Sequence, residues 1–144
     1  KKEQSYCISI LKNEKLISEK NFEYHLEYHN ILEIDYSRDN KLEDMGDFQF
    51  KDISLEVKDK KLFLETKNDD IHVIREVQKI NFLRSTDYNV KSIYKYRNIQ
   101  SIFSFLSLSK RNILSINNKS PLKLQIYGKN FELILISSNI SIIN

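Results

Sequence analysis

Residues 113–136 read ILSINNKSPLKLQIYGKNFELILI, and this segment carries the clearest structural pattern in the chain. Its apolar residues fall into three short runs, separated by two polar stretches that contain Asn or Gly, residues that readily adopt the positive φ angles of tight turns. Short apolar or alternating runs between turn residues are typical of β-strands. The segment therefore predicts three antiparallel strands joined by hairpins, at residues 113–116, 122–127 and 131–136.

An earlier part of the chain follows the same plan. Three β-type runs occur at residues 53–57, 62–65 and 71–74, and short polar stretches at 58–61 and 67–70 separate them. Corresponding positions in the two halves lie 60 or 61 residues apart, although the residues themselves are not repeated. A duplicated supersecondary unit explains this constant spacing.

Each triplet of strands is preceded by a candidate helix and, before that, by a short strand. The second helix is well defined because apolar residues recur at helical spacing, whereas the first has Ser37 as its N-cap, few apolar residues, and Gly46 as its stop. The upstream strands are expected at Leu32–Tyr36 and Tyr88–Val90. Two β-α-β-β-β units predict an α+β domain, an antiparallel sheet with two helices on one face. The apolar face of the second helix consists of Tyr96, Ile99, Ile102, Phe103 and Leu106.

Length and composition exclude several classes of protein. The chain has 144 residues, enough for one domain, and 40% of them are hydrophobic. No apolar run approaches the roughly 20 residues that a membrane-spanning helix needs. Two glycines and one proline leave no Gly-rich phosphate-binding loop. The single cysteine, Cys7, can form no internal disulfide, which favours a reducing compartment.

Charge is distributed unevenly along the chain. Residues 1–76 contain 13 basic and 18 acidic residues, whereas residues 77–144 contain 10 basic and 2 acidic residues. No acidic residue lies between Asp87 and Glu132. This asymmetry indicates an anionic partner for the second half.

Residues 88–137 contain, in order, Tyr88-Asn89-Val90-Lys91, Lys95-Tyr96, Leu106-Ser107-Leu108-Ser109, Pro121-Leu122 and the strand Phe131–Ile136. This order resembles the DNA sliding clamp family, whose type member is proliferating cell nuclear antigen and which includes the checkpoint clamp subunits. Each clamp domain in that family is two β-α-β-β-β units whose helices line a central hole. The resemblance implies a non-enzymatic subunit, without a cofactor, that helps to form a ring around duplex DNA in the nucleus and tethers replication, repair or checkpoint proteins.

The resemblance also divides the chain. Residues 1–15 match the end of a preceding domain, with a strand at Tyr6–Leu11, and residues 16–29 match the linker between clamp domains. Residues 30–137 match one clamp-like domain, and residues 138–144 form a tail. A clamp subunit has two such domains, whereas the 144 residues here have room for one. The first helix is also not basic, as the inner helices of clamps usually are. These departures point to a divergent or checkpoint-type relative.

The resemblance implies a DNA-binding surface on or beside the second helix. A ring that slides must attract phosphates without reading bases, so basic side chains without neighbouring acids are required. The alternative is a solvated helix face in a lysine-rich chain. The residues implied are Lys91, Lys95, Arg97, Lys110 and Arg111.

Partner proteins of clamps dock short peptides in a hydrophobic pocket beneath the linker. The matching strand positions are Pro121, Ile134 and Ile136, with the linker residues Phe22 and Leu26 above them. The alternative is that these are core residues of strands, which is favoured for Ile134 because alternate positions of a final strand are usually buried.

Two other functions remain open. Alternating residues 22–28 place His25, His29, Glu23 and Glu27 on one face of a strand, and histidine with carboxylate is a zinc-type ligand set. However, residues two apart on a strand are separated by roughly 6–7 Å, so a solvated polar face is favoured over a metal site. The remaining alternative is a β-rich protein-interaction module with no role in nucleic-acid binding.

Overall fold

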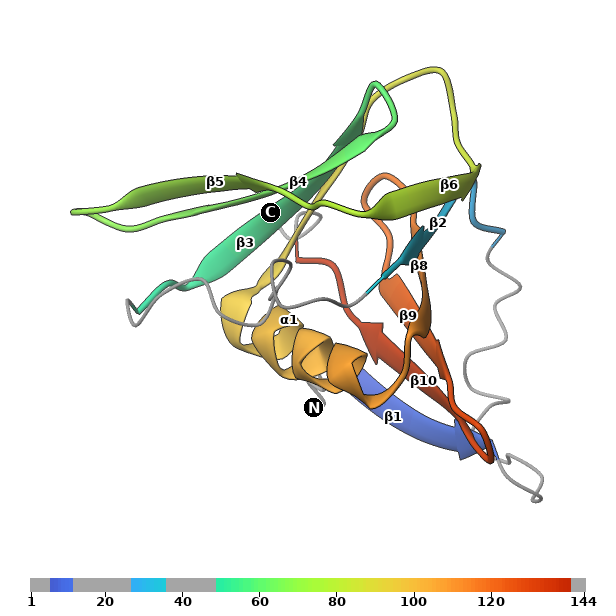
Figure 1. Ribbon diagram of the computed structural model, residues 1–144. Coiled ribbons are helices and arrows are strands. Elements are labelled where there is room, and N and C mark those ends of the chain that lie inside the picture. The colour runs from blue at the N-terminus through green and yellow to red at the C-terminus, as the bar shows by residue number, and fades with distance from the viewer. Residues whose placement is uncertain (1–5, 12–26, 36–48, 141–144) are drawn as a thin grey trace.

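A computed structural model of the chain describes residues 6–11, 27–35 and 49–140, and its strands form two antiparallel sheets (Figure 1). The larger sheet has six strands in the order β1-β10-β9-β8-β2-β6, and the smaller has four in the order β5-β4-β3-β7. The larger sheet consists of β1 (Tyr6–Leu11), β2 (Asn30–Ile34), β6 (Ile80–Arg84), β8 (Arg111–Ile116), β9 (Leu122–Tyr127) and β10 (Glu132–Ser137). The smaller sheet consists of β3 (Asp52–Lys58), β4 (Lys61–Lys67), β5 (His72–Glu76) and β7 (Val90–Lys95).

The hairpin strands lie where the sequence predicts them, as β3–β4–β5 and β8–β9–β10. At the β3–β4 turn, Asp59 and Lys60 adopt positive φ angles of 53° and 57°. At the β9–β10 turn, the Gly128 N–H donates a hydrogen bond of 2.9 Å to the carbonyl of Phe131. The strand predicted at Tyr6–Leu11 is also confirmed, and it pairs antiparallel with β10.

The strands that precede the hairpins cross over between the sheets. β2 pairs with β8, and β7 pairs with β3, so each upstream strand extends the sheet built by the other triplet. The other edge of β2 is taken by β6, a strand that the sequence analysis missed. Three residues after β10 ends, the Ile140 N–H donates a hydrogen bond of 2.8 Å to the carbonyl of Ile93 on β7. The chain after β10 therefore contacts the four-stranded sheet.

Two predictions about the sheet are wrong. The strands form two sheets rather than one, because β6 occupies the second edge of β2 and β7 pairs with β3. The upstream strands are displaced: β7 runs on to Lys95 because Val90, Ser92 and Tyr94 continue its alternating buried face. One α-helix is present among the described residues, and the first candidate helix, near Ser37, lies outside them.

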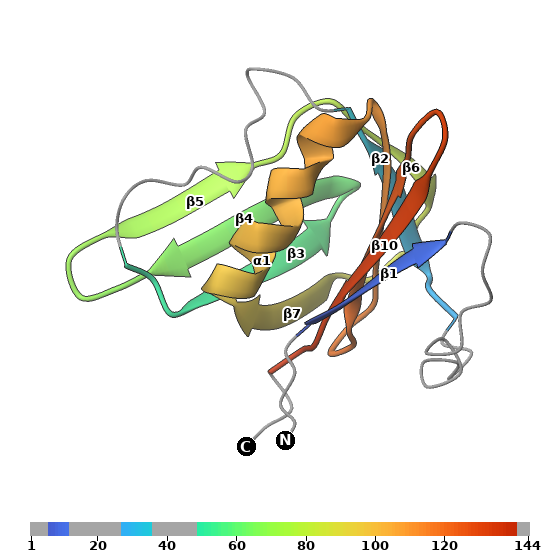
Figure 2. The same cartoon turned by 90° about the horizontal axis from the view of Figure 1, so that it is seen from below.

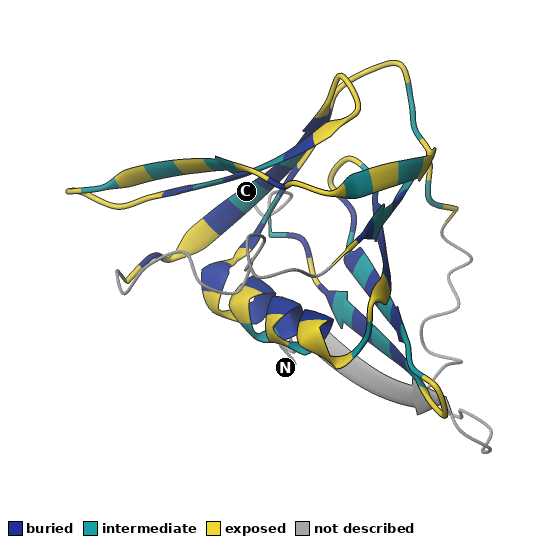
Figure 3. Ribbon diagram, viewed as in Figure 1, coloured by how far each residue is buried: buried dark blue, intermediate teal, exposed yellow. Residues whose placement is uncertain are grey.

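The described helix, α1 (Tyr96–Phe103), continues as a 3₁₀ helix, η3 (Ser104–Leu108). It lies in the angle between the two sheets and contacts β3, β7 and β10 (Figure 2). Most of its apolar residues are buried, and buried residues alternate with less buried ones along the surrounding strands (Figure 3). No helix in the described ranges is long and apolar enough to cross a membrane. The largest fully buried side chains include Tyr94, Phe103, Leu32, Ile34, Leu55, Leu62, Leu64, Ile99, Ile102, Leu106 and Leu114.

Candidate nucleic-acid and partner-binding surfaces

The solvent-exposed face of α1 is polar and carries one cation. Arg97, Gln100 and Ser104 are exposed, whereas the residues between them are buried or half-buried against the sheets. The first turn of the helix contains no acidic residue, so nothing on α1 neutralises Arg97. This face can therefore offer a guanidinium and hydroxyl groups to a polyanion.

Lys91 and Lys95 lie on a different face from Arg97. Both are exposed on β7, where the alternate residues Val90, Ser92 and Tyr94 are buried on the side of α1. In the pairing with β3, Lys91 lies opposite Glu56 and Lys95 lies opposite Asp52. Register partners in antiparallel strands project to the same face, so these two lysines share the outer face of the four-stranded sheet with carboxylates.

Arg111 is also turned away from the helix. Its neighbour Asn112 points into the core, so alternation places Arg111 on the outer face of β8. There its Nε lies 3.7 Å from a carboxylate oxygen of Glu33, and its guanidinium lies 5.0 Å from the centre of the Tyr127 ring. The structure therefore does not gather the five predicted DNA contacts on one surface.

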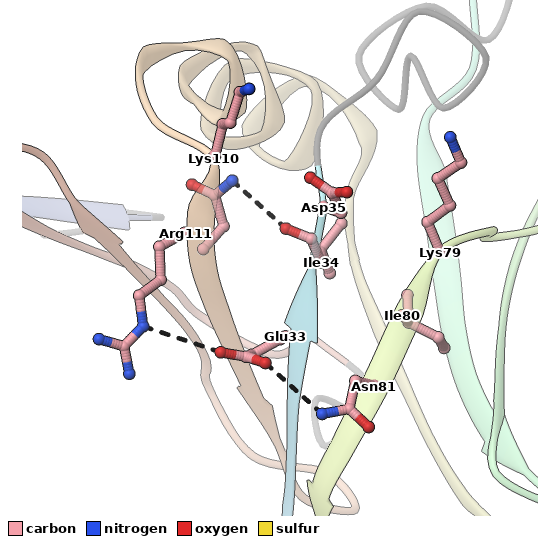
Figure 4. A pocket seen from close by; sticks show the side chains of 9 residues that line it. Glu33, Ile34, Asp35, Lys79, Ile80, Asn81, Lys110 and Arg111 are labelled. Atoms are coloured by element: carbon pink, nitrogen blue, oxygen red, sulfur yellow. Dashed lines mark hydrogen bonds and ion pairs between the residues drawn. The ribbon is translucent and has the colours of Figure 1, made fainter.

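Lys110 lines a cavity of about 470 Å³ at the ends of β2, β6 and β8 (Figure 4). Lys79 lines the same cavity, and both lysine side chains extend to the side on which Asp35 lies, away from Glu33. Lys79 is held there by the hydrogen bond of 3.1 Å from the Asp35 N–H to its carbonyl. The sequence analysis missed Lys79, because its position depends on a backbone bond to Asp35, 44 residues earlier, and on its own positive φ of 56° before β6, and no local pattern shows either.

The predicted partner-binding positions on the strands come together. Pro121 immediately precedes β9, and Ile134 and Ile136 lie on the adjacent β10; all three are half-buried. The alternation of buried residues places them on the outer face of the six-stranded sheet, away from α1. The linker residues Phe22 and Leu26 lie outside the described residues.

Tyr28 borders the surface formed by Pro121, Ile134 and Ile136, through its contacts with Pro121 and Lys123. Its hydroxyl donates a hydrogen bond of 2.9 Å to the carbonyl of Pro121, and the Lys123 ammonium lies 5.6 Å from the centre of its ring. Burial raises the pKa of the Tyr28 phenol to about 12. Asn117 fixes the adjoining backbone, because its Oδ1 accepts from the His29 N–H at 2.7 Å and its Nδ2 donates to the Glu27 carbonyl at 2.9 Å.

The turn at residues 117–121 joins the two sheets. The Ser92 hydroxyl on β7 donates to the Asn117 carbonyl at 2.9 Å and accepts from the Lys119 N–H at 2.8 Å. The Tyr94 hydroxyl donates to the Ser120 carbonyl at 2.8 Å. The turn between β8 and β9 of the six-stranded sheet is therefore hydrogen-bonded to β7 of the four-stranded sheet. β7 is the strand that leads directly into α1.

Because Tyr94 is fully buried, its phenol keeps its proton well above its ordinary pKa of 10. Above pH 10 the unfolded chain loses this proton and the folded chain keeps it, so stability should fall as pH rises through this range. We expect Tyr94→Phe to reduce that slope by about 1.4 kcal/mol per pH unit. Urea unfolding between pH 9 and pH 11.5 measures it, with the exposed Tyr88→Phe as the control. An unchanged slope in Tyr94→Phe would contradict the assignment.

The metal-site alternative gains no support from the described residues. No group of three or more His, Cys, Asp or Glu side chains in those ranges is arranged to hold an ion, and His25 and Glu23 lie outside them. His72 instead lies 2.6 Å from a carboxylate oxygen of Glu65 on the surface of the four-stranded sheet. The hydrogen bond from His72 is the main cause that lowers the pKa of Glu65.

Comparison with solved structures gives strong matches to clamps. Proliferating cellular nuclear antigen from Entamoeba histolytica aligns with 79% of this chain at a TM-score of 0.68 and 15% identity, covering 46% of that chain. A PCNA2–PCNA3 complex from Sulfolobus tokodaii aligns with 82% at a TM-score of 0.68 and 15% identity, covering 50% of that chain.

The chain thus spans about half the length of the solved structures that it matches. No protein-family model matches the sequence, and comparison with curated proteins gives no match either. The likeness rests on the arrangement of the two sheets and α1 rather than on shared residues. On that arrangement, the chain has the fold of a PCNA-like sliding clamp.

Proposed function

We propose that the chain is a sliding-clamp-like domain that helps to form a ring around duplex DNA and tethers replication, repair or checkpoint proteins, acting in the nucleus and without catalysis. The observation that carries the proposal is the clamp arrangement of two sheets with α1 between them. It is supported by a helix face that carries one cation and no acidic residue of the helix itself, in a segment that contains no acid from residue 88 to residue 131.

The geometry favours a subset of the predicted cations as DNA contacts. Arg97 lies on the exposed face of α1, and Lys110 follows η3 by two residues. Lys79 joins them, because it lines the same cavity as Lys110. Lys91, Lys95 and Arg111 project from outer sheet faces, so we assign them a smaller part in contact with a duplex on the α1 side.

Ring assembly needs an open sheet edge, and β5 is one. Among the described residues β5 pairs with β4 alone, and it forms one end of the four-stranded sheet. An unpaired edge presents free backbone N–H and carbonyl groups that a strand of another subunit can bind. We propose that β5 is a subunit contact of the ring.

Partner docking is proposed for the outer face of the six-stranded sheet. Pro121, Ile134 and Ile136 provide a half-buried apolar surface there, and Tyr28 borders it through its bond to Pro121. A short peptide with apolar anchors suits such a surface. Tyr28 lies near the end of residues 16–29, the segment proposed as the linker.

The test is a charge reversal on the α1 side. In Arg97→Glu/Lys110→Glu we expect weaker binding to a fluorescent duplex, and a slope of log K against log salt that is shallower by about 0.9 for each phosphate that the variant no longer neutralises. Fluorescence anisotropy titrations over a range of salt concentrations measure both quantities.

The matched control is Lys60→Glu/Lys61→Glu, the same charge change at the exposed β3–β4 turn. This variant should bind DNA nearly as well as the original chain, because its charges are distant from α1. An equal loss in both variants would mean non-specific attraction. Unchanged binding in Arg97→Glu/Lys110→Glu would contradict the DNA role and leave the β-rich interaction module as the function.

A further inference from the structure

The cavity at the ends of β2, β6 and β8 contains charged groups that are not paired with one another (Figure 4). Asp35 directly follows β2, the strand that lies between β8 and β6, whereas Lys110 and Lys79 directly precede β8 and β6. Figure 4 shows Asp35 between the two lysines. All three residues are exposed, and among the described residues none of them forms an ion pair. Opposite charges that converge without pairing leave room for a ligand between them.

The other charged groups of the cavity are already matched. The Arg111 Nε lies 3.7 Å from one carboxylate oxygen of Glu33, and the other oxygen accepts from the Asn81 Nδ2 at 3.5 Å. Glu33 is therefore balanced and does not oppose an anion on the lysine side. What remains in the lining is two ammonium groups against the single carboxylate of Asp35.

The wall of the cavity also contains a buried acceptor without a partner. Asn112 lines the cavity and is fully buried, and among the described residues nothing donates a hydrogen bond to its Oδ1. Buried polar atoms of this kind are uncommon in folded proteins, and a bound molecule or water often completes them. The volume of about 470 Å³ lies within the range of small-molecule sites, roughly 300–1,000 Å³.

We propose that this cavity binds a free sugar phosphate, a phosphate monoester that carries hydroxyl groups. The two ammonium groups suit the phosphate, which holds about 1.5–2 negative charges at pH 7. The carboxylate of Asp35 repels a second anion but accepts hydrogen bonds from hydroxyls, so it favours a sugar beside the phosphate. The inference goes beyond the proposed function, because it assigns a small ligand to the cavity and requires neither a ring nor a duplex.

The backbone of DNA matches these groups less well. Each phosphodiester carries one negative charge, and DNA has no 2′-hydroxyl to donate to a carboxylate. A phosphodiester would therefore leave Asp35 without a donor. The sugar phosphate supplies both the second charge and the hydroxyls, and these two properties set the probes for the test.

Isothermal titration calorimetry of the full chain with ribose 5-phosphate, inorganic phosphate and ribose tests the site. We expect ribose 5-phosphate to bind most tightly and ribose least. Lys79→Asn should weaken its binding about tenfold, because asparagine removes the charge yet tolerates the positive φ of 56°. Asp35→Ala should lower the preference for ribose 5-phosphate over inorganic phosphate several-fold, because it removes the hydroxyl acceptor and also the repulsion of the anion.

The matched controls are Lys60→Asn and Asp59→Ala at the exposed β3–β4 turn, where both residues also have positive φ. Both should bind like the original chain, and thermal unfolding checks that each variant folds. Equal affinity of the original chain for ribose 5-phosphate and inorganic phosphate, or equal affinity of Lys79→Asn and Lys60→Asn for ribose 5-phosphate, would overturn the inference. Tighter binding of a 5′-phosphorylated dinucleotide would also overturn it, because the ligand would then be the end of a strand.

The outcome is separable from that of the DNA test, because Arg97 is not among the residues that line the cavity. Binding of ribose 5-phosphate as expected, together with duplex binding that Arg97→Glu/Lys110→Glu leaves unchanged, would retain the sugar-phosphate site and reject the DNA role. Weaker duplex binding in that variant, with no binding of ribose 5-phosphate by the original chain, would reject the sugar-phosphate site alone.

Discussion

Replacing Asn112 by aspartate is expected to lower the free energy of unfolding by about 3–5 kcal/mol at pH 7, as for a buried charge without a partner. Asn112 is fully buried at the start of β8. Its Nδ2 donates to the carbonyls of Ser109 at 3.0 Å and of Ile34 and Leu106 at 3.4 Å. A carboxylate has no hydrogen to donate, so Asn112→Asp would set a negative charge against these three oxygens.

The effect should depend on pH in a definite direction. Burial and the facing carbonyls raise the pKa of the new carboxyl above its ordinary value of about 3.9, so the folded state binds more protons than the unfolded state. The deficit should therefore be smallest below pH 4 and should grow as pH rises through the raised pKa. Urea unfolding at pH 4 and pH 7 measures the difference.

Asn118→Asp is the matched control. Asn118 is exposed, and its Oδ1 accepts from the Lys91 N–H at 3.2 Å, a role that a carboxylate oxygen fills equally well. We expect a change within about 0.5 kcal/mol, as for most surface substitutions. Equal losses in Asn112→Asp and Asn118→Asp would show that Asn112 is not the buried donor described here.

Truncating Phe103 to alanine is expected to cost about 3–5 kcal/mol, the usual range for a large buried aromatic side chain. Phe103 is fully buried at the end of α1, where the helix lies between the two sheets. Its removal leaves a cavity that the rigid sheets on either side cannot close. The free energy of unfolding from urea titration provides the measurement.

Ser107→Ala, an exposed change on η3, serves as the control and should be nearly neutral. The two variants together test whether α1 is the shared core element of both sheets. A loss below about 1 kcal/mol in Phe103→Ala would mean that the site relaxes around the missing ring, and that the sheets pack without this anchor.

The sequence predicted the hairpin strands well, because period-two alternation and turn residues are local signals. The end of a strand is harder to predict: β7 was expected to end at Val90, yet its alternation continues to Lys95. β6 was missed because Ile80–Arg84 carries no regular alternation and no turn glycine precedes it. The division into two sheets depends on pairings such as Ile34 with Asn112, which no local pattern encodes.

The same limits apply to the candidate surfaces. Lys91, Lys95 and Arg111 are close to the helix in sequence, but strand alternation turns them to outer faces. Which face a residue takes depends on where the strand begins and ends, so an error of a few residues moves a side chain across the sheet. Lys79 could not be found because its position depends on a turn that joins strands of different sheets.

The hold of Asn117 on the backbone of Glu27 and His29 depends on its side-chain amide remaining intact. Asparagine slowly loses ammonia by spontaneous hydrolysis, and it is among the residues depleted from heat-stable proteins. The resulting aspartate would still accept from the His29 N–H but would present a negative oxygen to the Glu27 carbonyl in place of the donor. A molecule in which Asn117 has become aspartate would therefore hold Tyr28 against Pro121 less firmly than one with the amide intact.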